Sequence, residues 1–115
     1  MPKSLEYYLS KGFDKRMAAY FAAGRRMVVS VIPQANYQLL LTFDNKEQRL
    51  FDVKPLLEKG SVFAPLRDIN IFNRVYLDDT HAVCWDKNPQ IDSTKFWQNK
   101  IDISPDTCYV DSVLV

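Results

Sequence analysis

The stretch 37–53 constrains the fold of this chain more than any other part of the sequence. Two runs dense in Leu, Phe, Tyr and Val, 37–43 and 48–53, flank a short polar segment that begins with Asp44 and Asn45. Runs of β-forming residues on either side of Asp/Asn turn chemistry are typical of a β-hairpin. The sequence therefore predicts two antiparallel strands, which the remaining elements must cover.

The register of this hairpin follows from the loop length that gathers apolar side chains on one face. A two-residue loop at 45–46 would pair Leu39 with Asp52 and mix apolar and polar residues on both faces. A three-residue loop at 44–46 instead pairs Leu39 with Phe51. The apolar face that this second loop creates contains Tyr37, Leu39, Leu41, Phe51 and Val53.

A three-residue loop of this kind is a type I turn followed by one left-handed residue, here Lys46. A positive φ crowds the Cβ of any residue other than glycine, at a cost of about 1 kcal/mol. We therefore predict that Lys46→Gly stabilises the protein.

A chain of 115 residues, of which 47% are hydrophobic, is large enough to fold as one domain over residues 1–115. Its apolar runs are all shorter than the roughly 20 residues that a membrane span requires. The N-terminus lacks the basic segment and apolar core of a secretory signal, which predicts a soluble, cytoplasmic protein. In that compartment, Cys84 and Cys108 are expected to be buried free thiols rather than a disulfide.

Charge divides the chain into a basic arm, residues 1–26, and an acidic body, residues 28–115. The arm carries six basic and two acidic side chains, a net charge of +4, whereas the rest of the chain carries −3. This asymmetry suggests a nucleic-acid contact through Lys15, Arg16, Arg25 and Arg26. Because no dense basic run with interleaved aromatic residues is present, the favoured interpretation is that the arm docks on an acidic body, its own or that of a second copy.

The arm is expected to form two short helices. Ser4 and Asp14 stand where helix N-caps belong, and Gly12 and Gly24 stand where each helix would end. Helices shorter than about 12 residues are marginal in water, so their apolar stripe must dock on another surface. The apolar face of the hairpin is the first candidate for that surface.

Further strands are predicted on both sides of the central hairpin. The run 27–32 is apolar on both faces, which favours a place inside the sheet. The runs 75–77 and 81–85 form a second hairpin that extends the same sheet, and a strand at 101–103 precedes a short helical turn. The predicted fold class is α+β: a small, mostly antiparallel sheet built from two hairpins and an N-terminal strand, preceded by a short two-helix arm.

The sequence offers little for catalysis. His81 is the only histidine, and its spacing from Cys84 within one strand places the two side chains on opposite faces, where they cannot form a nucleophile–base pair. The histidine and the two cysteines match no zinc-ligand spacing, and the aspartates lack the spacing of a calcium loop. We predict no catalytic residue, no metal and no cofactor.

The polar segment that follows Trp85 is the best candidate for a functional surface. Aromatic and charged residues combine in it as they do in the anchors of protein interfaces. The candidate protein-binding residues are Trp85, Asp86, Asp92, Phe96 and Trp97. The alternative is that the aromatic residues form a small satellite core beneath a long loop.

Several short motifs over residues 28–109 occur in a characteristic order and spacing. They are Val28-Val-Ser-Val31, Leu41-Thr-Phe-Asp-Asn45, Asp52-Val-Lys-Pro-Leu-Leu57, Leu66-Arg-Asp68 through Phe72, a strand ending in Trp85, and Asp102-Ile-Ser-Pro-Asp106. Together they resemble the bacterial domain-of-unknown-function 2442 family. The chain departs from that family at Lys46, where glycine is usual, at the long segment 86–100, and in the arm, which lies outside the shared part.

The resemblance implies a small α+β protein without established activity or agreed catalytic residues, often encoded beside other small bacterial proteins such as toxin–antitoxin-like pairs. We therefore expect a non-enzymatic protein–protein interaction module whose partner is a small bacterial protein or a second copy, with no membrane contact. A nucleic-acid-associated regulator that uses the arm is the alternative. A cryptic enzyme or small-ligand binder using Trp85, Asp86 and Asp92 ranks last.

Overall fold

The central hairpin has the predicted loop and register. In the computed structural model, which describes residues 3–115, it consists of β2 (Gln38–Phe43) and β3 (Gln48–Asp52). Leu39 pairs with Phe51, and the amide of Lys46 closes the turn with a 2.8 Å hydrogen bond to the carbonyl three residues earlier. Lys46 has a φ of 71°, so the loop ends in a left-handed residue, as predicted.

Lys46→Gly is expected to raise the free energy of unfolding by about 1 kcal/mol, because glycine has no Cβ to crowd the backbone at this φ. Chemical denaturation measures the change. Lys59→Gly, at an exposed lysine whose φ is not positive, is the matched control and should leave stability unchanged or lower it. A clear loss of stability in Lys46→Gly would contradict this loop geometry.

The first sheet has four strands in the order β1–β2–β3–β7, with β1 (Val28–Gln34) and β7 (Val113–Leu114) at its edges. The expectation that the run 27–32 lies inside the sheet is therefore wrong, because β1 pairs within this sheet with β2 alone. An edge position lets β1 continue through Pro33, whose missing N–H would interrupt the hydrogen-bond ladder of a central strand.

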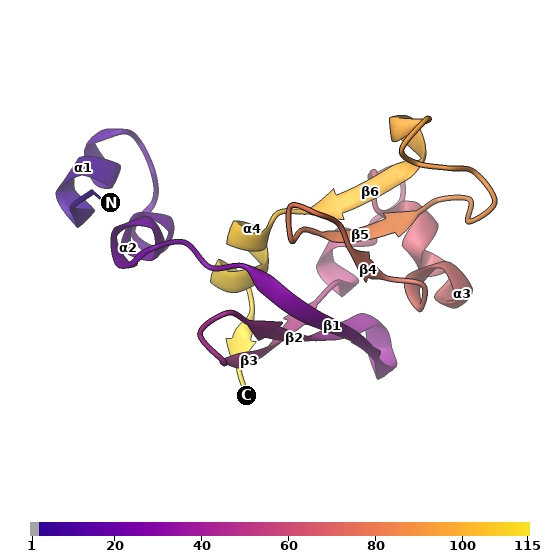
Figure 1. Ribbon diagram of the computed structural model, residues 1–115, viewed down its shortest axis with the longest axis horizontal. Coiled ribbons are helices and arrows are strands. Elements are labelled where there is room, and N and C mark those ends of the chain that lie inside the picture. The colour runs from indigo at the N-terminus through magenta and orange to yellow at the C-terminus, as the bar shows by residue number, and fades with distance from the viewer. Residues whose placement is uncertain (1–2) are drawn as a thin grey trace.

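The second sheet consists of β4 (Tyr76–Leu77), β5 (Val83–Asp86) and β6 (Lys100–Ile103). The second hairpin thus starts a sheet of its own instead of extending the first, and it lies over the inner face of the first sheet (Figure 1). With two antiparallel sheets and helices before and between them, the α+β class is confirmed.

Short helices complete the body. They are α3 (Ile69–Phe72), α4 (Pro105–Val110) and the 3-10 helices Ala35–Tyr37, Lys54–Leu56, Ala64–Arg67 and Trp97–Asn99. The Ser104 hydroxyl caps α4 by accepting a hydrogen bond from the Thr107 amide at 3.2 Å. No helix in the described part of the chain is long and apolar enough to cross a membrane.

The apolar face of the hairpin is covered by the second sheet, α3 and α4. One buried cluster joins the hairpin to these elements and includes Leu39, Leu41, Phe43, Phe51, Val53, Phe72, Val83, Trp85, Ile101, Ile103 and Cys108. The arm, which was the first candidate from the sequence, contributes none of its described residues to this cluster. The second sheet offers a continuous apolar surface, which two short helices cannot match, and so it forms the cover.

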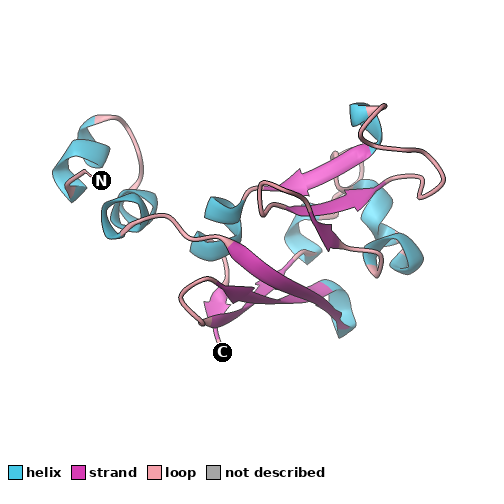
Figure 2. Cartoon of the chain, viewed as in Figure 1, coloured by secondary structure: helices cyan, strands magenta, loops and turns pink. Residues whose placement is uncertain are grey.

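The arm forms a helical hairpin of α1 (Leu5–Ser10) and α2 (Lys15–Ala23) beside the body (Figure 2). The predicted caps are confirmed: the side chains of Ser4 and Asp14 accept hydrogen bonds from the first turns, and Gly12 and Gly24 have positive φ. The arm extends the molecule to 44 × 30 × 27 Å, with its longest axis running from the arm to the far end of the second sheet (Figure 1).

Candidate protein-interaction site

The loop 87–99 joins β5 to β6 and is held in one shape by Asn99. Its ends meet because Asp86 pairs with Lys100. The buried Asn99 amide group donates to the carbonyls of Asn88 at 3.0 Å and Ile91 at 3.1 Å, and its Oδ1 accepts from the Asn88 amide at 2.9 Å. One side chain at the end of the loop therefore fixes three backbone groups in its first half, which leaves little conformational freedom to lose on binding.

The loop presents large apolar side chains to solvent. Trp97 is 75% exposed and Phe96 is 59% exposed, and Ile91 is also exposed. Neither aromatic residue joins the buried cluster of the body, so the satellite-core alternative does not describe them. Exposed aromatic residues on an ordered backbone are the usual anchors of protein interfaces.

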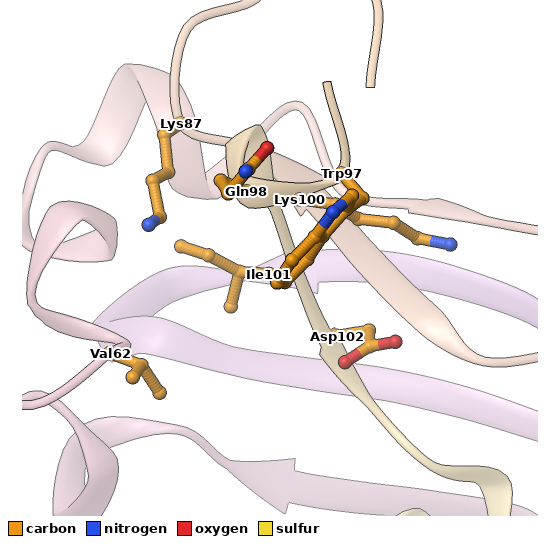
Figure 3. Close-up of a pocket in the computed structure, with 7 residues that line it drawn as sticks. All are labelled: Val62, Lys87, Trp97, Gln98, Lys100, Ile101 and Asp102. Carbon is orange, nitrogen blue, oxygen red and sulfur yellow. The ribbon is translucent and has the colours of Figure 1, made fainter. Parts of the chain in front are cut away.

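Two hollows lie beside these side chains. The first, of about 390 Å³, is lined by Val62, Lys87, Trp97, Gln98, Lys100, Ile101 and Asp102 (Figure 3). In this view Trp97 stands on one side of the hollow, and Val62 and Lys87 stand on the other. The second, of about 500 Å³, is lined by Lys87, Ile91, Phe96, Gln98 and Asn99. Lys87 and Gln98 belong to both, so the hollows adjoin along the loop.

Three of the sequence-predicted site residues, Trp85, Asp86 and Asp92, stabilise the fold instead. Trp85 is completely buried and its indole N–H donates to the carbonyl of Phe72 at 2.9 Å. Asp86 accepts hydrogen bonds from the hydroxyls of Tyr76 at 2.8 Å and Ser93 at 2.6 Å. The structure therefore does not place Trp85 on the surface with Trp97, and it uses Asp86 to fasten β4 and the loop to β5.

Asp92 shapes a turn within the loop. Its carboxylate accepts from the hydroxyl of Thr94 at 2.6 Å and from the Thr94 amide at 2.9 Å. These hydrogen bonds, that from the hydroxyl first, lower the pKa of Asp92. Asp92 thus supports Phe96 indirectly, since the Phe96 amide donates to the Asp92 carbonyl at 3.0 Å.

Asn99, the residue that organises the loop, was missed in the sequence. Asparagine is common in turns and loops, and nothing in its neighbours distinguishes a buried Asn99 from an exposed Gln98. The only available signal was its position directly before the strand at 101–103, where a loop has to be closed.

The three arginines of the arm face carboxylates of the body. Arg25 makes a two-pronged contact with Asp106, at 3.1 and 2.8 Å, and the hydroxyl of Tyr20 donates to the same carboxylate at 2.6 Å. Arg16 lies 3.1 Å from Asp111, and Arg26 lies 3.8 Å from Asp44. The arm thus docks on the acidic body of its own chain, as the favoured interpretation predicts, and Lys15 is exposed.

Asp106→Asn is expected to loosen the arm, because it removes the charge that Arg25 and Tyr20 share. We expect a loss of about 1 kcal/mol in the free energy of unfolding and faster trypsin cleavage after Arg25 and Arg26. Asp111→Asn is the matched control, since its partner Arg16 is largely exposed and such pairs contribute little. Equal cleavage rates in the wild type and Asp106→Asn would contradict this attachment.

The two cysteines and the histidine lie against other residues of the body. Cys84 and Cys108 are free and fully buried, which confirms the sequence prediction, and burial raises the pKa of Cys84 to about 12. His81 Nδ1 lies 3.2 Å from the carbonyl of Val28. Within residues 3–115 no group of three or more His, Cys, Asp or Glu side chains could hold a metal ion.

Comparison with known proteins gives one family. A family model described as "Protein of unknown function (DUF2442)" matches residues 28–112. No curated protein and no solved structure matches the chain. The match begins at the first residue of β1 and ends before β7, so it contains β1 to β6 and the loop 87–99 and leaves the arm outside.

Proposed function

This chain belongs to the DUF2442 family, and we propose that it is a non-enzymatic protein–protein interaction module whose contact surface is the loop 87–99. The exposure of Trp97 on a loop fixed by Asn99 is the observation that carries the proposal. A tryptophan can supply a large share of the binding energy of an interface when a partner buries it. Because the loop is already ordered, little of that energy is spent on ordering it.

The partner that this surface fits is a small protein with an apolar pocket for the indole and acidic groups around it. Lys87 lines the hollow beside Trp97, and Lys95 lies in the same loop, whereas Lys100 in that hollow is paired with Asp78 and Asp102 also lines it. Basic groups at the rim of an apolar patch favour carboxylates on the other side. A bacterial, cytoplasmic partner encoded beside this chain, as in a toxin–antitoxin-like pair, is the setting that we propose.

Photo-crosslinking tests the proposal in the native cell. A photoreactive phenylalanine at Trp97 is expected to give one discrete adduct, whereas the same residue at Ile69, an exposed position on α3, should give none. The purified partner should bind Trp97→Ala at least about tenfold more weakly than the wild type, as expected for a central aromatic anchor. Failure to form an adduct at Trp97, or unchanged affinity in Trp97→Ala, would refute the loop as the contact surface.

A nucleic-acid role for the arm is the second proposal, and the structure gives it less support. Arg16, Arg25 and Arg26 already face carboxylates of the body, so phosphates would have to compete for them. Lys15 remains exposed. Filter binding at low salt decides the question: a lack of affinity for both duplex and single strands would exclude this role.

A further inference from the structure

The first sheet has a second face, opposite the buried cluster, which we call the outer face. Strand register aligns Ile32 with Leu40, Leu40 with Leu50, and Leu50 with Val113. Directly paired residues point to the same side of an antiparallel sheet. The four aliphatic side chains therefore form one continuous row across all four strands.

No described element covers this row. The second sheet, α3 and α4 lie on the other side of the first sheet, and the 3-10 helix Ala35–Tyr37 lies at its end, between β1 and β2 (Figure 2). None of the four residues belongs to the buried cluster or packs against it, and the two at the ends of the row, Ile32 and Val113, are 49% and 71% exposed. A solvated sheet face ordinarily carries polar residues, whereas here every strand contributes one aliphatic residue to the row.

The outer face is also nearly free of charge. The positions around the row are Ser30, Thr42, Gln34, Gln38 and Gln48. Asp52 is the one formal charge at a paired outward position, and Lys54 lies 3.3 Å from it. The chain as a whole has 25% charged residues, so the outer face is depleted of charge. Such depletion is typical of the core of a protein interface.

We infer that a second copy of this chain packs on the outer face, row against row, around a two-fold axis. Two copies of an almost uncharged aliphatic surface are self-complementary, because no like charges oppose each other when the faces meet. Antiparallel sheets pack in this way with their faces about 10 Å apart. The central residues Leu40 and Leu50 then lie nearest to the axis and to their own counterparts.

This contact is independent of the loop 87–99. The loop belongs to the second sheet, and the outer face is the side of the first sheet that points away from the second (Figure 1). A dimer formed through the outer faces leaves both copies of Trp97 open, so it presents two binding loops.

Sedimentation equilibrium over a range of micromolar concentrations tests the dimer. We expect the wild type to dimerise, and we expect Leu50→Lys and Leu50→Glu each to raise the dimer dissociation constant at least about tenfold through like-charge repulsion at the axis. Mixing the two variants should restore a dimer, because opposite charges then meet. Val62→Lys, a 68% exposed position beside the loop, is the matched control and should dimerise like the wild type.

The possible results distinguish self-association through the outer face from self-association through the loop region. A wild type that stays monomeric overturns the inference, and so does a dimer that survives both Leu50 variants. A dimer lost in Val62→Lys but retained in Leu50→Lys would assign self-association to the loop region instead. Recovery in the mixture excludes misfolding as the cause of dissociation, and buried-tryptophan fluorescence from Trp85 checks the fold of each variant separately.

Discussion

Trp85→Ala is expected to lower the free energy of unfolding by about 3–5 kcal/mol. The side chain is fully buried, its ring lies 6.1 Å from that of Phe72, and its N–H donates to the carbonyl of Phe72. Alanine would leave a cavity between the two sheets and remove one of the two hydrogen bonds that the Phe72 carbonyl accepts. Since small domains have total stabilities of about 5–15 kcal/mol, this single change removes a large part of the total.

Trp97→Ala is the matched control, because it deletes the same side chain from a solvent-exposed position. We expect a change within about 0.5 kcal/mol. Urea denaturation followed by circular dichroism measures both variants without relying on tryptophan fluorescence. Similar losses from the two substitutions would mean that Trp97 packs against the body and that the proposed contact surface is wrong.

Asn99→Ala is expected to destabilise the protein by about 2–3 kcal/mol and to release the loop 87–99. Alanine removes the hydrogen bonds that the Asn99 side chain makes to the carbonyls of Asn88 and Ile91 and to the amide of Asn88. Hydrogen exchange of the Asn88 amide should accelerate much more than that of the amides in β2. Partner binding should weaken even though the exposed apolar side chains of Ile91, Phe96 and Trp97 are unchanged.

Gln98→Ala is the control for this prediction, since Gln98 is the exposed neighbour of Asn99. It should change neither the stability nor the exchange rate of the Asn88 amide. If Asn99→Ala retained both partner affinity and slow exchange in the loop, pre-ordering by Asn99 would not be the basis of binding.

The parts of the fold that depend on neighbouring residues could be predicted from the sequence. The register of the central hairpin follows from the requirement that the apolar residues share one face. Only a three-residue loop meets this requirement. The helices of the arm follow from Ser4, Asp14 and two glycines, whose cap chemistry acts within one turn of helix. In both cases the deciding interactions join residues close in the chain.

The parts that depend on distant residues could not be predicted. Whether β1 lies inside the sheet or at its edge depends on where β7 pairs, some 80 residues further along the chain. The two tryptophans show the same limit at the candidate site. Trp85 ends an apolar run and Trp97 lies among polar residues, but whether each indole points between the sheets or to solvent is decided by packing against residues distant in the chain.

The way in which the arm is attached determines which substitutions in the arm affect the body of this protein. The described part of the arm touches the body at α4 and near the hairpin turn, through Tyr20, Arg16, Arg25 and Arg26, and contributes nothing to the buried cluster. Substitutions in the arm that keep its contacts to Asp106 and Tyr109 are therefore expected to leave the two-sheet body intact, so the binding surface of the arm can change without a change of fold.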